Sequence, residues 1–329
     1  MIKYRLKGGS LSSTYLCENT NKQKFVRKEI SLTQNREYGF VRWYSQLKKL
    51  QRYENLSSKI FPKILSTSFE SNYAYFDIEY MNGYKDIKQI LTDEVIDNFQ
   101  IEKIVNAFCN ALDVLHKTKL NKIPGSPWLY YKEEVDQKIL DAISTKEFSE
   151  FYELKKYSYN GLPVNGIQVF RSQLEKFFQN LEFETEELTH GNPTLENSLY
   201  SFVEDKVIFV DPYEEGIIDS KFLDYSQVLQ CSRSGYGYIN DRSVKVQNNF
   251  VSFDYEIPEN FKKFNDLFVS KVIESKYRYI IDVLEATQFI RMLPFKCYAG
   301  DIDKAKYFYV HACYLLEKAF TNDFSKFID

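Results

Sequence analysis

The period of the hydrophobic pattern changes near residue 83, and this change limits the fold of the 329-residue chain more than any other feature. Before it, short runs rich in β-branched and aromatic residues alternate with turns, as in "STYLCEN", "KFVRKEI" and "YAYFDIEYM". After it, apolar residues recur at helical spacing, most clearly in "IEKIVNAFCNALDVLHKT". The pattern therefore predicts an α+β chain, with a β-rich part at residues 1–82 and a mainly helical part at residues 83–329.

The first 82 residues predict five strands and one helix. Two runs on either side of a glycine-rich turn indicate a hairpin, and "KFVRKEI" indicates a third strand. Helical spacing follows at residues 34–52, and two further strands end at Asn82-Gly83. We expect a small, mostly antiparallel sheet with a single helix.

The rest of the chain predicts several helices around a short hairpin at residues 189–213. The helical patterns lie at residues 101–118, about 167–182, about 261–285 and 301–318. Between them, "YNGLPVNG" at residues 159–166 is interpreted as a loop.

Composition favours a soluble cytoplasmic protein. The net charge of −3 offers no basic footprint for nucleic acid, and no apolar run approaches the roughly 18 residues of a membrane span. The N-terminus lacks the apolar core of a secretion signal. Five scattered cysteines without a CxxC pattern are expected to be buried free thiols.

The segment "THGNPTLENSLY", followed by "VIFVDPYEEG", has the character of a phosphoryl-transfer site. Asn197 and the strand-ending Asp211 offer the hard oxygen atoms that Mg²⁺ prefers. With His190 they form a more specific pattern than any one of them alone. The competing interpretation is that each polar residue caps a turn or a helix.

Two features of the β-rich part fit the same chemistry. Lys28, on the third strand, would point an ammonium group at phosphates if Glu37, in the first turn of the next helix, held it. A turn whose backbone N–H groups can approach phosphates closely is formed by Gly8, Gly9 and Ser10. Either feature alone also fits an ordinary solvated lysine or hairpin turn.

These motifs resemble the aminoglycoside phosphotransferase and choline kinase-like group, which are relatives of the protein kinases. "LTHGNPTLENSLY…VIFVDPYEEG" is similar to their H-G-D-x-x-x-x-N motif and the metal-binding aspartate of the following strand. "HGNPTLEN" resembles small-molecule kinases found with bacterial capsule and surface-polysaccharide genes. "FVRKEI", "NREYGFVRWYSQL" and "YFDIEYMNGY" resemble the lysine strand, the glutamate helix and the hinge, while "ALDVLHK" and "KFLDYSQVLQ" resemble two helices of the larger lobe.

The resemblance implies a bilobal protein-kinase-like fold that binds ATP and Mg²⁺. Lys28 would contact the α/β-phosphates and Glu37 would hold it, with Lys24 and Glu29 as rivals for these two roles. Asn197 and Asp211 would bind the metal, and the turn at residues 8–13 would cover the nucleotide. The backbone around Glu79, Tyr80 and Met81 would bind adenine. Asp224 would have a structural role.

Asn192 departs from this pattern, because it stands where the family has its catalytic aspartate. An amide can accept a hydrogen bond from a hydroxyl but cannot usefully take its proton, and general-base help contributes about 10²–10⁴-fold in rate. Three readings follow. The chain is a pseudokinase that binds nucleotide and regulates a partner, a slow enzyme whose base is Glu196 or Glu214, or an active kinase with one Asp→Asn exchange.

The sequence hypothesis is an ATP-dependent kinase that phosphorylates a hydroxyl of a small molecule, such as a sugar or an amino-alcohol. The resemblance places it in capsule or surface-polysaccharide biosynthesis, with other enzymes of that synthesis as partners. The acceptor is expected between the hairpin and the C-terminal helices, where the candidate lining residues are Tyr213, Glu214, Arg233 and Tyr236. A protein kinase is disfavoured because the chain has no D-F-G or A-P-E segment.

Overall fold

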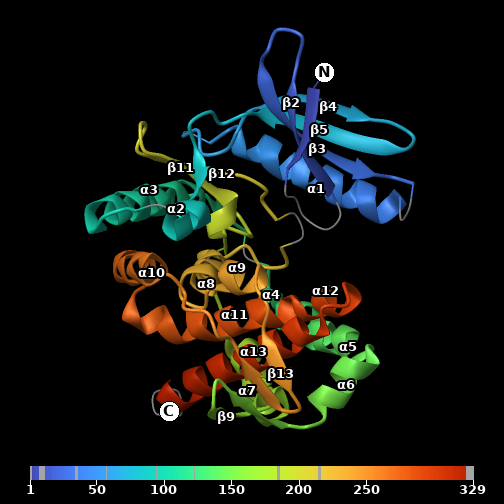
Figure 1. Cartoon of the computed structure of the whole chain (residues 1–329), viewed down its shortest axis with the longest axis vertical. Coiled ribbons are helices and arrows are strands. Elements are labelled where there is room, and N and C mark those ends of the chain that lie inside the picture. Colours follow the sequence, from blue (N-terminus) through green and yellow to red (C-terminus); the bar gives the residue numbers. More distant parts are fainter. Residues whose placement is uncertain are drawn as a thin grey trace.

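The chain folds into an antiparallel sheet followed by a set of packed helices, which is the predicted α+β class (Figure 1). The division between residues 82 and 83 stays a prediction. The computed structural model describes residues 2–6, 12–33, 36–56, 58–93, 95–121, 123–183, 186–213 and 216–323. The predicted phosphate-covering residues Gly8, Gly9 and Ser10 lie outside these ranges, as does Glu214.

The N-terminal sheet has five antiparallel strands in the order β1-β2-β3-β5-β4. They are β1 (Ile2–Leu6), β2 (Ser12–Glu18), β3 (Lys24–Ser31), β4 (Ile64–Phe69) and β5 (Tyr73–Glu79). Helix α1 (Arg36–Tyr53) packs on this sheet, because it presents a stripe of buried apolar residues such as Trp43, Leu47 and Leu50. The five strands and one helix predicted from the sequence are confirmed.

The remaining helices form the larger part of the molecule. They are α2 (Ile87–Asp93), α3 (Asn98–His116), α4 (Ser126–Tyr130), a π-helical segment at Tyr131–Asp136, α5 (Gln137–Ile143), α6 (Lys146–Tyr152), α7 (Ile167–Asn180), α8 (Lys221–Ser232), α9 (Tyr236–Asn240), α10 (Glu259–Val272), α11 (Arg278–Arg291), α12 (Leu293–Tyr298) and α13 (Ile302–Asp323). Short 3₁₀ turns lie at Leu195–Asn197 and Ser275–Tyr277.

Short strands lie between these helices and pair with one another in small sheets. The strands are β6 (Lys85–Asp86), β7 (Lys119–Leu120), β8 (Lys156–Tyr159), β9 (Leu162–Asn165), β10 (Glu186–Glu187), β11 (Ser198–Ser201), β12 (Lys206–Phe209), β13 (Lys245–Gln247) and β14 (Phe250–Ser252). Their sheets have the orders β12-β11-β6, β13-β14-β8-β9 and β10-β7, and the β14–β8 pair is parallel.

Two element predictions were wrong. The segment at residues 159–166 is the β8–β9 hairpin, because Asn160 and Gly161 both adopt the positive φ that a tight two-residue turn requires. The helix expected at residues 261–285 is two helices, α10 and α11. They separate because α10 packs against α3, whereas α11 packs against α8 and α13.

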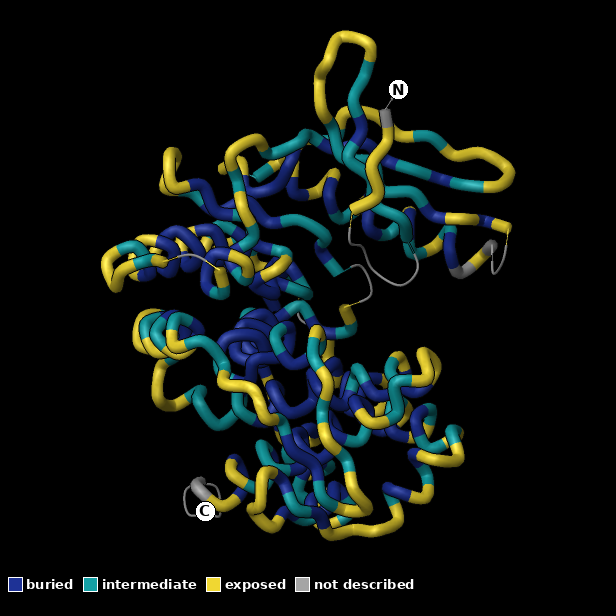
Figure 2. Tube along the Cα trace, in the orientation of Figure 1, coloured by how far each residue is buried: buried dark blue, intermediate teal, exposed yellow. Residues whose placement is uncertain are grey.

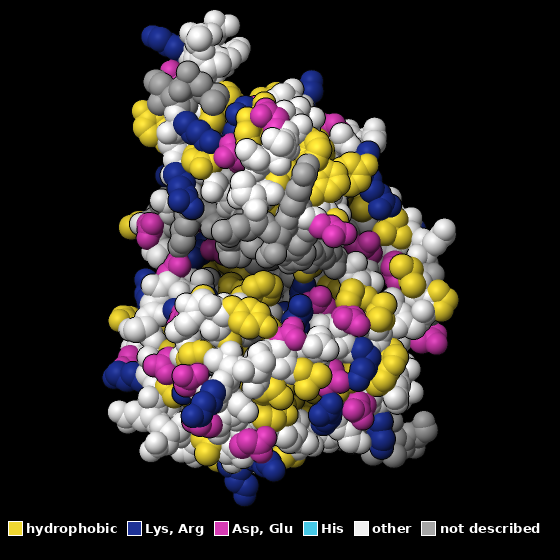
Figure 3. Space-filling view, turned by 90° about the vertical axis from the view of Figure 1, so that its right-hand side faces the viewer, with side chains coloured by type: hydrophobic (Ala, Val, Ile, Leu, Met, Phe, Trp, Pro, Cys, Tyr) yellow, Lys and Arg dark blue, Asp and Glu magenta, His cyan; other side chains and the backbone are white. Residues whose placement is uncertain are grey.

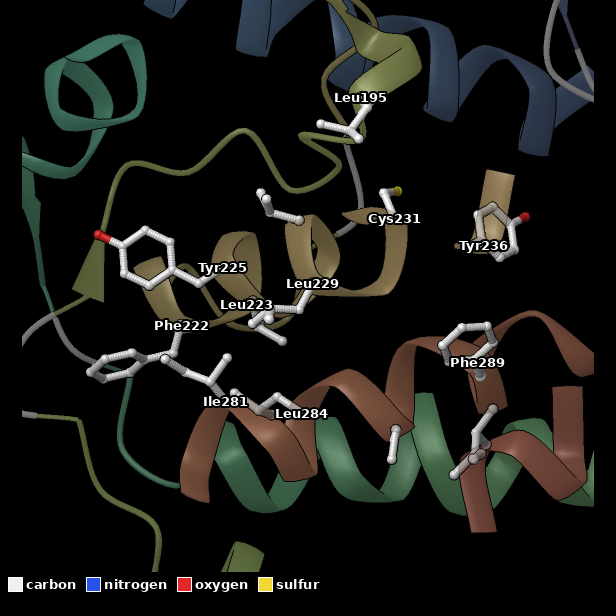
Figure 4. Close-up of a cluster of buried hydrophobic side chains, with 14 of the residues drawn as sticks. Leu195, Phe222, Leu223, Tyr225, Leu229, Cys231, Tyr236, Ile281, Leu284 and Phe289 are labelled. Atoms are coloured by element: carbon white, nitrogen blue, oxygen red, sulfur yellow. The ribbon is translucent and has the colours of Figure 1, made fainter. Parts of the chain in front are cut away.

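Helix α8 lies at the centre of the helical part. It is buried along nearly its whole length, and its apolar residues interlock with α11 (Figure 4). Buried residues run continuously through this region, while exposed residues gather at the loops around it (Figure 2). All five cysteines are buried and free, as predicted.

Surface charge and helix length concern two of the sequence predictions, that the chain has no basic footprint for nucleic acid and no membrane span. On the face shown in Figure 3, Lys and Arg side chains alternate with Asp and Glu, in keeping with the net charge of −3. Within the described ranges, the structure has no helix that is both long and apolar enough to cross a membrane.

Candidate functional site

The 189–213 segment forms the predicted hairpin and brings its two candidate metal ligands to one end. Strands β11 and β12 pair from Ser198–Phe209 onward, and just beyond that pair the N–H of Val210 donates to the carbonyl oxygen of Asn197 at 2.9 Å. Asp211 follows directly, in a left-handed conformation with φ 56°. A non-glycine residue held in this conformation is uncommon and often marks a functional site.

The side chain of Asn197 is oriented by the loop that precedes it. Its Nδ2 donates to the carbonyl oxygen of Asn192 at 3.1 Å. The amide nitrogen is thereby used within the loop, which leaves Oδ1 as the atom that can coordinate a cation. An amide oxygen and a carboxylate at one hairpin end are a donor set that suits Mg²⁺.

Lys28 reaches the same place from β3, where it forms an ion pair with Asp211. Its rival Lys24 is exposed at the start of the strand. Glu29 points to the other face of the sheet and pairs with Lys3 at 3.0 Å.

The expected pairing of Lys28 with Glu37 is not found. Glu37 is exposed in the first turn of α1, and Lys28 uses Asp211 instead. The α1 residue that reaches the site lies more than two turns further along. Gln46 is buried, and its Nε2 donates to Oδ1 of Asp211 at 2.7 Å and to the carbonyl oxygen of Pro212 at 2.9 Å.

The carboxyl group of Asp211 is held ionised by these partners. Burial alone would raise its pKa, but the charge of Lys28 and the hydrogen bonds from Lys28 and Gln46 outweigh burial and lower the pKa below its usual value. A carboxylate that is already ionised and paired with one cation can exchange that cation for another.

One face of α1 holds the loops on both sides of the hairpin. Lys49 donates from Nζ to the carbonyl oxygen of Tyr213 at 2.7 Å, and the Tyr53 hydroxyl donates to the carbonyl oxygen of Thr189. With Gln46, these residues lie at positions i, i+3 and i+7 of the helix. Sequence reasoning missed them. The available signal was Gln46 itself, a polar residue on an apolar stripe that needs a buried partner.

Asp224, in the first turn of α8, anchors the loop from the opposite side. Its side chain is fully buried and accepts hydrogen bonds from the backbone N–H groups of His190 (2.9 Å) and Gly191 (2.8 Å) and from Nε2 of His116 (3.0 Å). Burial would raise the pKa of Asp224, but His116 and these other donors lower it overall. The structural role expected for Asp224 matches this geometry.

The glycine of the "HGN" sequence allows the two halves of the site to approach closely. Gly191 is left-handed, with φ 79°, and a Cβ there would lie 3.1 Å from Cβ of Tyr213 and 3.2 Å from Nζ of Lys49. A larger residue would therefore be strained in its backbone and would displace both neighbours.

His190 is a buried structural residue of the loop. The N–H of Asn192 donates to its Nδ1 at 3.1 Å, so the proton sits on Nε2, which donates to the carbonyl oxygen of Val210 at 3.1 Å. Burial lowers the pKa of His190 to about 4, so the ring is neutral at pH 7. It orients the loop and is not placed to act as an acid or a base.

The neutral His190 predicts a loss of stability in mild acid. The unfolded chain takes up a proton near pH 6.5 but the folded chain only near pH 4, so stability is lost as the pH falls between these values. We expect a loss of about 1.6 kcal/mol between pH 6.5 and pH 5, because the slope approaches about 1.36 kcal/mol per unit only below pH 6.5. Urea unfolding of the chain and of His190→Gln over this range measures it. A slope that His190→Gln leaves unchanged would contradict the assignment.

Asn192 lies half-buried in the centre of this loop. Its carbonyl oxygen and its N–H are both hydrogen-bonded, whereas its side chain makes no hydrogen bond to the residues that the structure describes. The rival base Glu196 is exposed and pairs with Lys88 at 3.2 Å. The side-chain amide of Asn192 is therefore available for a hydrogen bond to a bound molecule.

The expected adenine-binding segment follows β5. Glu79 pairs through its side chain with Lys59 at 2.7 Å, and Met81 accepts from the N–H of Tyr84 at 3.4 Å. The N–H of Met81 makes no hydrogen bond to the described part of the chain. It thus offers a donor of the kind that a nucleobase requires.

Two of the expected acceptor residues lie at and just beyond the C-terminal end of α8. Tyr236 is buried against Phe289 and Phe308, and Arg233 caps the far end of α8, where it pairs with Asp282 at 2.6 Å.

Tyr213 does stay at the hairpin, where it meets a cation from α11. The guanidinium carbon of Arg291 lies 5.1 Å from the centre of the Tyr213 ring. Glu134, of the π-helical segment, accepts from Nε of Arg291 at 2.6 Å and fixes this arrangement. Arg291 is a further residue of this region that the sequence did not indicate.

Among the residues described, no cluster of three or more His, Cys, Asp or Glu side chains could hold a metal ion. A cation at Asn197 and Asp211 would therefore need phosphate and water oxygens to complete its coordination, as Mg²⁺ usually does in nucleotide sites. No protein-family model matches the chain, and no curated protein matches it significantly.

Proposed function

We propose that the chain is a Mg²⁺- and ATP-dependent phosphotransferase with a bilobal, protein-kinase-like fold. One observation carries the proposal: Lys28 from the sheet pairs with Asp211 at the end of the hairpin to which the Val210–Asn197 backbone hydrogen bond also brings Asn197. A cation donor beside a pair of hard oxygen ligands is the set of groups that phosphoryl transfer needs.

The chain's own residues would divide the work of binding. Asn197 and Asp211 would hold Mg²⁺, Lys28 would turn from Asp211 to the phosphates, and the N–H of Met81 would bind the base. Bound Mg²⁺ supplies charge neutralisation on the transferred phosphoryl group. Gln46 would keep the Asp211 carboxylate in place when Lys28 leaves it.

The acceptor would be a hydroxyl of a small molecule, such as a sugar or an amino-alcohol of bacterial surface-polysaccharide synthesis. Asn192 would accept a hydrogen bond from that hydroxyl and orient it, without taking the proton. Tyr213 and Arg291 lie beside the hairpin and would border the acceptor.

A second candidate is a pseudokinase that binds nucleotide and regulates a partner enzyme. The observation that favours it is the amide of Asn192 where a general base would act. Both candidates require nucleotide binding, and they differ in turnover.

Nucleotide binding is tested by Asp211→Asn. We expect the Kd for ATP with Mg²⁺ to rise about 10- to 100-fold, since a charged interaction contributes roughly 1.5–3 kcal/mol. Isothermal titration calorimetry with and without Mg²⁺ measures it. Asp205→Asn is the matched control, because Asp205 is also left-handed (φ 49°) and lies at the other end of the same hairpin. Failure of the chain to bind ATP with Mg²⁺, or equal effects of the two variants, would rule out both candidates.

A further inference from the structure

A pocket of about 790 Å³ lies in the helical part. Its walls come from the end of β8, from α9, α11 and α13, and from residues 253–257. Arg233, at the C-terminal end of α8, lines it, whereas Asp224, in the first turn of α8, holds the hairpin loop. The residues that line this pocket include none from α1, β3 or the hairpin. Its volume is in the usual range for small-molecule sites.

The pocket combines ring faces with hydrogen-bonding groups. The aromatic residues in its walls are Tyr159, Phe253, Tyr255, Tyr279, Tyr307 and Tyr314. Asn160, Ser234 and His311 lie among them. Aromatic faces favour a flat or ring-shaped ligand, while the interspersed polar groups would lose hydrogen bonds to a purely apolar one. A ring that carries hydroxyl groups satisfies both.

His311 has an unused hydrogen-bonding atom in this wall. Its side chain is 5% exposed, and its Nδ1 is 2.6 Å from the hydroxyl of Tyr159, which in turn is 3.1 Å from the hydroxyl of Tyr307. Its Nε2 is buried and has no partner among the described residues. Burial, with Arg233 and Lys318 nearby, lowers the pKa of His311 to about 3, so the ring is neutral. Buried polar atoms are normally paired, and a ligand hydroxyl would pair this one.

The pocket also carries an excess of positive charge. Asp282 pairs with both Arg233 (2.6 Å) and Arg278 (3.0 Å). Glu285, which does not line the pocket, also pairs with Arg233. Lys318 is exposed and makes no ion pair within the described ranges, and its ammonium lies 4.4 Å from the centre of the Tyr314 ring. One cation is therefore left to meet an acidic group.

We propose that this pocket binds a hydroxylated ring with one acidic group, namely a sugar phosphate or a sugar acid. The site is separate from the phosphoryl-transfer centre and does not depend on its function. The ring lies against the tyrosines, a hydroxyl bonds to His311, and the acidic group meets Lys318.

Calorimetric titration of the full chain with defined probes tests the proposal. We expect glucose 1-phosphate or glucuronate to bind about tenfold or more tightly than glucose, which lacks the charge, since a charge-assisted hydrogen bond contributes that much. The phosphate and the carboxylate probes distinguish the two ligand sources. Phenyl phosphate, which lacks hydroxyls, should bind more weakly than glucose 1-phosphate. Failure of both anionic sugars to bind, or tighter binding of phenyl phosphate, would overturn the proposal.

Variants assign the binding to this pocket. Lys318→Glu and Tyr255→Ala change exposed side chains of the wall and should each weaken binding about tenfold or more. Lys262→Glu makes the same charge change at an exposed position of α10 and should have no effect. Lys28→Gln should also leave binding unchanged. Loss of binding in Lys28→Gln with retention in Lys318→Glu would place the ligand at the phosphoryl-transfer centre and overturn the assignment.

Discussion

Replacing Asn192 with aspartate is expected to raise the rate of phosphoryl transfer from ATP by about 10²–10⁴-fold, the usual contribution of a general base. The loop can accept this substitution without a change in its backbone. The backbone of Asn192 is fixed by Asn197 and His190, and its side chain gives up no hydrogen bond to the described residues when it is replaced. The isosteric carboxylate would therefore stand where the amide now stands. Release of ADP with a panel of sugars, amino-alcohols and polyols, in a coupled assay, measures the rate.

Two controls separate the readings of Asn192. Glu196→Gln should leave the basal rate unchanged, because the Glu196 carboxylate is exposed and paired with Lys88. A large fall in that variant would identify Glu196 as the base of a slow enzyme. Asn192→Leu, which can neither accept nor take a proton, should stay at or below the basal rate. If Asn192→Asp binds ATP with Mg²⁺ but transfers no faster than the unchanged chain, the pseudokinase candidate is favoured.

The parts of the fold that the sequence predicted are those governed by local period. Runs rich in β-branched and aromatic residues such as "KFVRKEI" and "YAYFDIEYM", bounded by turns, made the succession of five strands and one helix along the N-terminal part predictable. The hairpin ligands were predictable for a similar reason. Asn197 and Asp211 flank two short strands whose pairing brings them together whatever surrounds the hairpin.

The partner of Lys28 was not predictable from local pattern. Glu37 satisfied a local rule, a carboxylate in the first turn of the helix after the lysine strand. Which turn of α1 reaches the hairpin depends instead on how the helix sits on the sheet. That arrangement is set by contacts between residues far apart in the chain, and it brings Gln46 rather than Glu37 to Asp211.

The neighbours of Arg233 and Tyr236 were not predictable for a different reason. Helix α8 is buried on all sides, so its sequence has no single apolar stripe that would indicate which neighbours it separates. Arg233 instead pairs with Asp282 of α11, and Tyr236 packs against Phe289 and Phe308. The pocket that Arg233 lines combines residues from β8 to α13. Residues so far apart in the chain leave no local sequence pattern that would predict the pocket.

Asp224→Asn is expected to destabilise the chain by about 3–5 kcal/mol, the usual cost of breaking a buried charged group from its partners. The fully buried carboxylate accepts three hydrogen bonds, from His190, Gly191 and His116. An asparagine of the same shape keeps one acceptor oxygen, but its NH₂ group must face at least one of these N–H donors. Denaturant unfolding at pH 7.5 measures the change.

The control for this variant is Asp113→Asn, on the exposed face of α3, for which we expect a change within about 0.5 kcal/mol. Because Asp224 holds the consecutive N–H groups of His190 and Gly191, its loss should also weaken binding of ATP with Mg²⁺ while the chain is still folded. A destabilisation as small as that of Asp113→Asn would mean that α1, through Lys49 and Tyr53, fixes the loop without Asp224. The two anchors are then distinguished by Tyr53→Phe, which removes only the hydroxyl bond to Thr189.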